Sequence, residues 1–286
     1  MNDQKPAYHV ASFSGGKDST AMVLHMIERG DHLDEVICCD TTMEFPAMNR
    51  HIEKVRKVIE AAGIKFTMLK AEHDFNYWMF DHVPKRRSDK LKNKKGFSWP
   101  GPRQRWCTEQ LKSAVIRRYL RTLRDQYNVI QYIGLAADEG YRLARKSNQT
   151  EDKIYPLVIW GWTEDDAMRY CRDSGYDWEG LYDIFDRVSC WCCPLQGIGS
   201  LRLLYHYSSE LWQELKRMDD RTWRSFLKDY SVDDLTLRFE LEDALISIGE
   251  SITDRAFHAD RKRVLARECT INDIVNERRA KKGVAS

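Results

Sequence analysis

The chain has 286 residues, of which 42% are hydrophobic, and its formal net charge at pH 7 is +2. This length suffices for one large α/β domain with an appendage or for two modest domains, and the apolar content excludes wholesale disorder. A net charge so close to zero argues against a protein whose whole surface binds nucleic acid. Residues 1–6 are polar and no uncharged apolar run approaches about 18 residues, so we expect a cytoplasmic protein that does not bind membranes.

Predicted strands and helices alternate through the first half of the chain. A strand over residues 8–13 leads into a glycine-rich loop, and a helix over 19–29 stops at Gly30. The pattern continues with strands over 35–39, 65–69 and 131–135 and helices over 48–62 and 107–127. This alternation predicts an α/β fold with a doubly wound parallel sheet. We expect residues 1–165 to form a nucleotide-binding domain and residues 166–286 to form a mainly helical C-terminal region.

A basic segment interrupts this alternation. Residues 70–106 contain three prolines, and from Lys85 to Lys95 seven Lys and Arg side chains are opposed only by Asp89. An excursion of this length in a compact domain is usually either functional or disordered. The run of charge is typical of a solvated loop or of a contact with an anionic substrate or nucleic acid.

The loop after the first strand has the composition of a phosphate-binding site. Its residues are Ser14, Gly15, Gly16, Lys17, Asp18 and Ser19. The glycines let the backbone approach an anion closely, and the unpaired N–H groups at the start of the next helix point at it. Lys17 supplies a mobile charge, whereas Asp18 makes most sense as a ligand of a bridging Mg²⁺ or as a helix-start residue. The alternative is an ordinary strand–turn–helix junction, which also favours Ser, Gly and Asp.

Five segments in chain order resemble the phosphoadenosine phosphosulfate (PAPS) reductase family of the adenine nucleotide α-hydrolase, or PP-loop, superfamily. The glycine-rich loop resembles the pyrophosphate loop, and residues 40–46, 105–112, 134–145 and 155–160 resemble later motifs of the family. The resemblance covers about residues 8–200. Two departures, Thr42 in place of the usual glycine and Ala136 where the family often has arginine, leave the nucleotide and the substrate open.

The resemblance also implies roles for individual residues. It implies that the loop binds ATP with further contacts from Asp40, Thr41, Gly134, Asp138, Glu139 and Arg145. It implies catalytic roles for Lys17, Asp18, Cys107 and Arg142. Within the matched segments or just before them, the basic side chains that could bind phosphate or sulfate oxygens are Arg103, Arg105, Lys112, Arg142 and Arg145.

Three of the eight cysteines form a candidate metal site. Cys190 and Cys193 make a C-x-x-C motif followed by proline, and Cys107 lies far upstream. In a reducing cytosol, clustered cysteines indicate metal or redox chemistry rather than disulfides. In the iron–sulfur members of this family, a Cys-Cys pair and a distant C-x-x-C motif bind the cluster together. In this chain, Trp106 stands in the first position of that pair.

The sequence therefore predicts that Cys107, Cys190 and Cys193 hold a [4Fe-4S] cluster with one open iron. An open coordination position is what makes a metal site catalytic rather than structural. Two alternatives stay open, namely a zinc site that includes Cys192 or His206, and free thiols.

Together these features predict an ATP-dependent sulfur transferase that adenylates its acceptor, releases pyrophosphate and inserts sulfur. ATP, Mg²⁺ and the cluster would be its cofactors. Its partners would be a nucleotide substrate, a nucleic-acid or small-molecule sulfur acceptor, and a sulfur donor protein or sulfide; a homodimer is left open. The nearest alternative is a PAPS or APS reductase, although Glu268 and Cys269 match only the first two residues of that enzyme's E-C-G-x-H motif. The other alternative is a non-catalytic subunit that binds nucleotide or nucleic acid.

Overall fold

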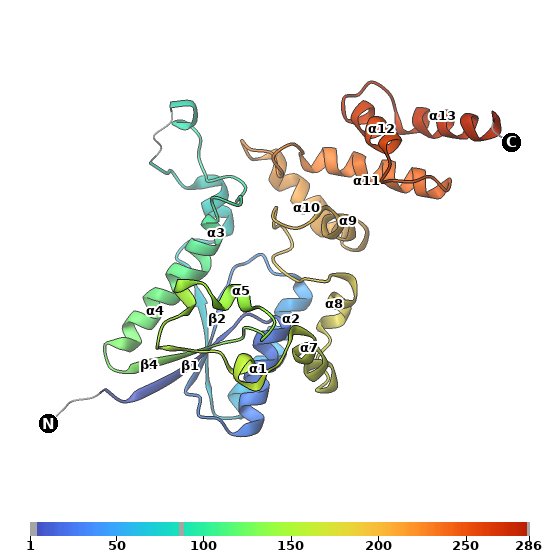
Figure 1. The fold of residues 1–286 in the computed structure, drawn as a ribbon. Helices are drawn as coiled ribbons and strands as arrows, with labels where there is room; N and C mark the ends of the chain where they lie inside the picture. The colour runs from blue at the N-terminus through green and yellow to red at the C-terminus, as the bar shows by residue number, and fades with distance from the viewer. Residues whose placement is uncertain (1–4, 86–88, 285–286) are drawn as a thin grey trace. The chain divides into compact units, whose positions relative to one another are not determined.

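A computed structural model describes residues 5–85 and 89–284 of the chain (Figure 1). Arg86 and Arg87 of the basic segment therefore lie outside the described residues. The chain divides into two compact units. Unit 1 consists of Met1–His82 and Pro102–Cys193, and unit 2 consists of Val83–Gly101 and Pro194–Ser286.

Unit 1 is built on a parallel sheet of five strands in the order β3-β2-β1-β4-β5. The strands are β1 (Ala7–Phe13), β2 (Glu35–Asp40), β3 (Lys65–Lys70), β4 (Asn128–Ile133) and β5 (Lys153–Ile154). The strand order reverses between β1 and β4, and parallel sheets with such a reversal bind ligands in the crevice beyond the carboxyl ends of the two strands. The predicted α/β fold with a doubly wound parallel sheet is confirmed.

Helices cover both faces of this sheet. The crossovers β1-α1-β2 and β2-α2-β3 proceed in one direction and β3-α4-β4 returns in the other, so right-handed connections place α1 and α2 opposite α4. On the α4 face, Val115 and Leu120 pack with Val10, Ile37 and Val129 from three strands. The principal helices are α1 (Lys17–Arg29), α2 (Pro46–Ala61), α4 (Ala114–Arg124), α6 (Pro156–Trp160), α7 (Glu164–Asp173) and α8 (Leu181–Ile184).

The helix predicted over 107–127 is helical in three successive pieces. It consists of α3 (Trp106–Thr108), a π-helical turn η3 (Glu109–Ser113) and α4. A second π-helical turn, η1 (Tyr77–Asp81), follows β3. π-turns inside helices are uncommon and occur frequently at functional sites. Here η3 follows α3, which contains Cys107, and η3 itself contains Lys112. The remaining short elements of unit 1 are α5 (Gly140–Leu143), η4 (Lys146–Asn148) and η5 (Trp178–Gly180).

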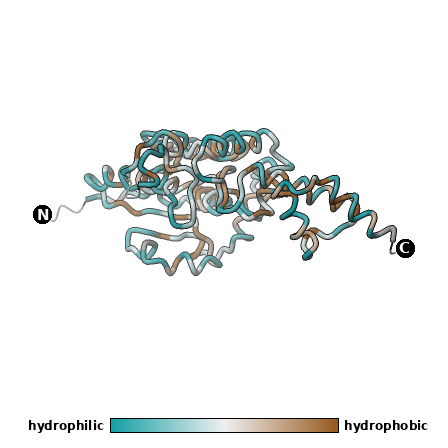
Figure 2. The backbone as a smooth tube through the Cα atoms, turned by 90° about the horizontal axis from the view of Figure 1, so that it is seen from above, coloured by the Kyte–Doolittle hydropathy of each residue, from teal (hydrophilic) through white to brown (hydrophobic). Residues whose placement is uncertain are grey.

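Unit 2 joins the predicted excursion to the C-terminal helices. Its elements are η2 (Asp89–Leu91), α9 (Ile198–Tyr207), α10 (Ser209–Asp220), α11 (Val232–Ser247), α12 (Arg255–Leu265) and α13 (Ile271–Val284). Hydrophilic and hydrophobic residues are interspersed along these helices (Figure 2). Trp99 is fully buried, its Nε1 donates to Asp219 Oδ1 at 2.7 Å, and its ring meets that of Phe226. The segment around Trp99 is therefore part of a core, which corrects its interpretation as a surface excursion.

The two units divide after Cys193, whereas the sequence led us to expect a boundary near residue 165. Helix α7 starts at Glu164 and packs against α1, so the chain just beyond residue 165 still contributes to unit 1. The segment that ends at Cys193 belongs to unit 1 as well. Among the described residues, none of the helices is long and apolar enough to cross a membrane.

The close approach of Gly134 to the backbone of α1 leads to a testable prediction. A Cβ built on Gly134 would lie 2.8 Å from both the Cα and the N of Ser19, which are backbone atoms of α1 that cannot move aside independently. We expect Gly134→Ala to lower the free energy of unfolding by about 1–3 kcal/mol, measured by urea denaturation. Gly140→Ala is the matched control because no heavy atom lies within 4 Å of its added Cβ. Equal stabilities of the two variants would contradict this close approach.

Candidate functional site at the carboxyl edge of the sheet

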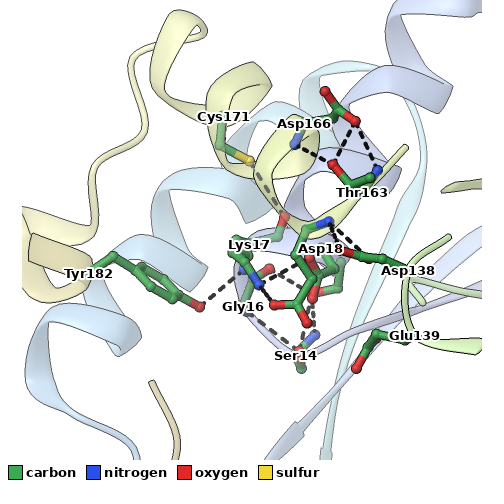
Figure 3. Close-up of polar contacts among 12 residues, drawn as sticks. Ser14, Gly16, Lys17, Asp18, Asp138, Glu139, Thr163, Asp166, Cys171 and Tyr182 are labelled. Atoms are coloured by element: carbon green, nitrogen blue, oxygen red, sulfur yellow. Dashed lines mark hydrogen bonds and ion pairs between the residues drawn. The ribbon is translucent and has the colours of Figure 1, made fainter. Parts of the chain in front are cut away.

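The glycine-rich loop leads directly from β1 into α1. Gly15 has a φ of +78°, and a Cβ there would lie 2.6 Å from Met48 Sδ, so this position requires glycine. Gly16 is the N-cap of α1 and has no side chain that could cap the helix. The hydroxyls of Ser14 and Ser19 lie 3.1 Å apart, and Ser19 Oγ also donates to the Gly16 carbonyl (Figure 3). A helix N-terminus without a side-chain cap can bind an anion through its backbone N–H groups.

Acidic side chains surround the ammonium group of Lys17. Its Nζ is hydrogen-bonded to Glu164 Oε2 and lies 3.4 Å from Asp18 Oδ1. This Asp18 oxygen is buried and has no hydrogen-bond partner. Burial raises the pKa of Asp18 to about 6, although the Lys17 charge opposes the shift. Asp18 thus offers an unsatisfied oxygen beside the loop, which is the kind of ligand that Mg²⁺ prefers.

Residues far along the chain complete the surroundings of Lys17. Its backbone N–H donates to the Tyr182 hydroxyl at 3.2 Å, and Cys171 Sγ donates to its carbonyl at 3.5 Å (Figure 3). Glu164 and Tyr182 are site residues that were not expected from the sequence. No motif or spacing relates them to the loop, because they reach it only through the packing of α7 and α8 in unit 1.

The segment after β4 forms the other side of the switch point. Asp138 accepts the backbone N–H of Glu164 at 3.2 Å and so fixes the start of α7. Glu139 is buried and pairs with the guanidinium of Arg142 at 2.6 Å and 2.8 Å. The guanidinium of Arg145 lies 5.9 Å from the centre of the Tyr141 ring. Arg142 is therefore held in an ion pair, and its predicted catalytic role would require that it also reach a ligand.

The segment after β2 contains a strained residue. Thr42 has a φ of +62°, which is the left-handed region where a β-branched side chain is unfavourable and glycine is not. Its N–H donates to Asp40 Oδ1 at 2.8 Å, and its hydroxyl donates to the Thr41 carbonyl. Although threonine replaces the family's glycine, the backbone keeps the left-handed conformation that glycine favours. The two hydrogen bonds hold it there.

A pocket of about 380 Å³ opens beside this segment. It is lined by the residues that follow β2 and β3 and by two side chains from η1 and η3, namely Asp40, Thr41, Thr42, Lys70, Ala71, Glu72, His73, Asp74, Tyr77 and Leu111. The rings of His73 and Tyr77 stack with centroids 3.7 Å apart. Three carboxylates and one lysine line the pocket, so it disfavours phosphate or sulfate and can accept an uncharged planar ring.

The cysteines of the predicted metal site share one neighbourhood in unit 1. Burial raises the pKa of Cys107, and the nearby sulfur of Cys193 raises it further. Burial and then Glu44 raise the pKa of Cys190 to about 12. Cys192 is fully buried, and the same three thiols raise its pKa further. Burial thus favours the protonated form of Cys107, Cys190 and Cys192, and metal binding would have to displace these protons.

Charged side chains adjoin these thiols. Glu44 Oε1 accepts hydrogen bonds from Thr41 Oγ1 at 3.0 Å and from Cys190 Sγ at 3.5 Å. Lys112 Nζ lies 3.4 Å from the same oxygen. Since Thr41 directly follows β2 and lines the pocket, the thiols lie at the same edge of the sheet as the loop after β1.

The donor set fits an iron–sulfur cluster in chemistry, since thiols predominate in this neighbourhood, with Cys192 and the Glu44 carboxylate beside the three predicted ligands. Among the residues that the structure describes, however, no three His, Cys, Asp or Glu side chains converge closely enough to hold a metal ion. Cluster binding would need Cys107, Cys190 and Cys193 to draw nearer. His206, the alternative zinc ligand, is in unit 2, where its Nε2 lies 3.4 Å from Asp243.

Comparisons with known proteins place residues 8–196 within a family model described as the phosphoadenosine phosphosulfate reductase domain. A protein of Methanocaldococcus jannaschii, designated "Uncharacterized protein MJ0066", is 24% identical over 229 residues, which are 78% of this chain and 42% of that protein. The chain thus spans less than half the length of this relative. Among solved structures, the U34-tRNA thiolase NcsA from Methanococcus maripaludis with its [4Fe-4S] cluster is 17% identical, with a TM-score of 0.36 over 88% of this chain and 77% of that chain.

The raised pKa of Asp18 predicts a specific pH dependence of stability. The folded-state pKa of about 6 exceeds the ordinary value of 3.8, so the folded state binds this proton more tightly than the unfolded state. The contribution of this proton to the stability of the fold is therefore fully present below pH 3.8, the ordinary pKa, and is lost as the pH rises through 6. We expect the stability of the wild type relative to Asp18→Asn to fall by up to about 3 kcal/mol between pH 4 and pH 7. Urea denaturation at several pH values measures it, and a difference independent of pH would contradict the shift.

Proposed function

The chain belongs to the PAPS reductase family, and from this premise we propose that it is an ATP-dependent sulfur transferase. The observation that carries the proposal is the sharing of one sheet edge by two kinds of group. The phosphate loop with Lys17 follows β1, and Thr41, which lies 3.9 Å from Cys190 Sγ, follows the neighbouring strand β2. An anion site and a group of thiols side by side suit a reaction that first activates an oxygen with a nucleotide and then replaces it with sulfur.

In the first step, the N–H groups of the loop and Lys17 bind the β- and γ-phosphates of ATP. An oxygen of the acceptor attacks the α-phosphorus, the bond to the bridging oxygen breaks, and pyrophosphate leaves. The charge that develops on the leaving group is stabilised by Lys17 and the helix N-terminus, which are fixed before the reaction begins. Asp18 would hold Mg²⁺, which would neutralise phosphate charge, because its buried Oδ1 has no hydrogen-bond partner.

In the second step, sulfur at the oxidation level of sulfide attacks the acceptor atom that bears the adenylated oxygen. The bond from that atom to oxygen breaks, AMP leaves with the electron pair, and the proton of hydrosulfide passes to solvent or to a nearby base. Cys107, Cys190 and Cys193 would hold a [4Fe-4S] cluster, which would supply iron to bind sulfide and keep it nucleophilic at neutral pH. Lys112 and Glu44 would position the ligand thiols through the contacts described above.

The reductase alternative needs a catalytic cysteine near the C-terminus. Cys269 is partly buried and packs against the core of Leu241, Leu245, Phe257, Val264 and Ile274 in unit 2. Burial raises the pKa of its thiol. A nucleophilic cysteine requires a lowered pKa and free access, so these surroundings favour a structural role for Cys269.

The cluster part of the proposal predicts the iron content of the protein. Purified without oxygen, it is expected to be brown and to contain about four irons and four sulfides per chain. Cys107→Ala and Cys193→Ala are expected to lose most of the iron, whereas Cys269→Ala, the matched control in unit 2, should retain it. Colourless, iron-free wild-type protein, or iron retained by all three variants, would contradict the assignment of ligands.

The nucleotide part predicts the cleavage products of ATP. In the presence of an acceptor, the wild type is expected to release AMP and pyrophosphate, measured by chromatography. Lys17→Gln should slow this release by about a hundredfold or more, since one charge-stabilising donor is lost. Release of ADP and phosphate, or an undiminished rate in the variant, would count against the proposal.

A further inference from the structure

The ammonium group of Lys17 already has an anion bound to it. Glu164 Oε2 accepts a hydrogen bond from Lys17 Nζ, the same atom to which nucleotide phosphates would bind. Glu164 is the first residue of α7, whereas Lys17 is the first residue of α1. The carboxylate of one helix start therefore lies at the anion-binding start of another.

The side chain of Glu164 is able to leave while its backbone stays in place. It is 44% exposed, compared with 21% for Asp18, the other carboxylate beside Lys17. The start of α7 is fixed independently, because Thr163 and Asp166 form a reciprocal capping box and Asp138 accepts the Glu164 N–H. Rotation of the Glu164 side chain alone would thus release Lys17 toward a ligand.

We propose that Glu164 occupies the phosphate site of the free protein through Lys17 and that an incoming pyrophosphate group displaces it. Glu164 is then a residue that sets the affinity of the site, because every nucleotide binds by exchanging one anion for another. The inference rests on the proposed nucleotide-binding role of the loop. Glu164 is then a competitor for Lys17 within the chain itself, and this competition lowers the affinity for nucleotide. A ligand must carry enough negative charge to replace the carboxylate.

Two effects of Glu164 on binding oppose each other. The carboxylate competes with phosphate for Lys17, but it also holds the flexible Lys17 side chain in one orientation. In Glu164→Gln the amide oxygen can still accept a hydrogen bond from Nζ, and Asp18 remains 3.4 Å away. Lys17 is itself only 13% exposed. The orientation of Lys17 is therefore retained in this variant. Loss of the competing charge then decides the direction of the change in affinity, which is an increase.

The test measures the dissociation constant of inorganic pyrophosphate by calorimetry at low ionic strength. Glu164→Gln is expected to bind about fivefold more tightly than the wild type, the upper range for a partly exposed ion pair. Asp165→Asn is the matched control, since it removes the same charge from the next residue, which is exposed. Its affinity should stay near that of the wild type. Thermal denaturation of each variant checks that the fold is intact.

The effect should depend on Lys17. In a Lys17→Gln background, Glu164→Gln is expected to leave the pyrophosphate affinity unchanged, because the group for which it competes is gone. Affinity of Glu164→Gln equal to or weaker than that of Asp165→Asn would overturn the inference, while a wild-type affinity reduced by Lys17→Gln would still support the nucleotide site. If pyrophosphate binds neither the wild type nor Glu164→Gln, the nucleotide site and this inference are both overturned.

Discussion

The close approach of two backbone segments at the switch point of the sheet is the constraint on which the site depends. Gly134, just after β4, lies so near the start of α1 that a single Cβ would overlap Ser19. On the other side of α1, Gly15 takes a left-handed conformation against Met48. These two contacts fix the first turn of α1, and its N–H groups can bind an anion only because that turn is held in place.

The rest of unit 1 arranges charge and sulfur around this turn. Acidic groups from α1 and α7 lie beside Lys17, so the positive charge at the start of α1 is offset in the free protein. At the end of β2, Thr41 and Glu44 connect the sheet edge to Cys190, and the π-turn after Cys107 presents Lys112 to the same carboxylate. The positive charge near the thiols is therefore paired as well.

Much of this arrangement follows from the sequence. The strand–helix alternation and the loop from Ser14 to Ser19 are local patterns, and both appear in the structure. The proximity of Cys107 and Cys193 is not a local pattern, because the two residues are far apart in the sequence; it was expected through the resemblance to the family. The contact of Glu164 with Lys17 joins residues 147 positions apart and depends on how α7 packs, which no local pattern encodes. The burial of Trp99 was missed for a similar reason. Prolines and lysines around it indicate a loop, while its partners lie more than a hundred residues later.

The central claim is that the anion site and the thiols serve one reaction. It is tested most directly by incubating the protein anaerobically with ATP, Mg²⁺, isotopically labelled sulfide and candidate nucleic-acid or small-molecule acceptors. Nucleotide products and labelled sulfur in the acceptor are then quantified by mass spectrometry. The account predicts equal amounts of AMP and pyrophosphate, with one labelled sulfur in the acceptor for each AMP formed. Reduction of PAPS to sulfite with a thiol reductant, without cleavage of ATP, would contradict it.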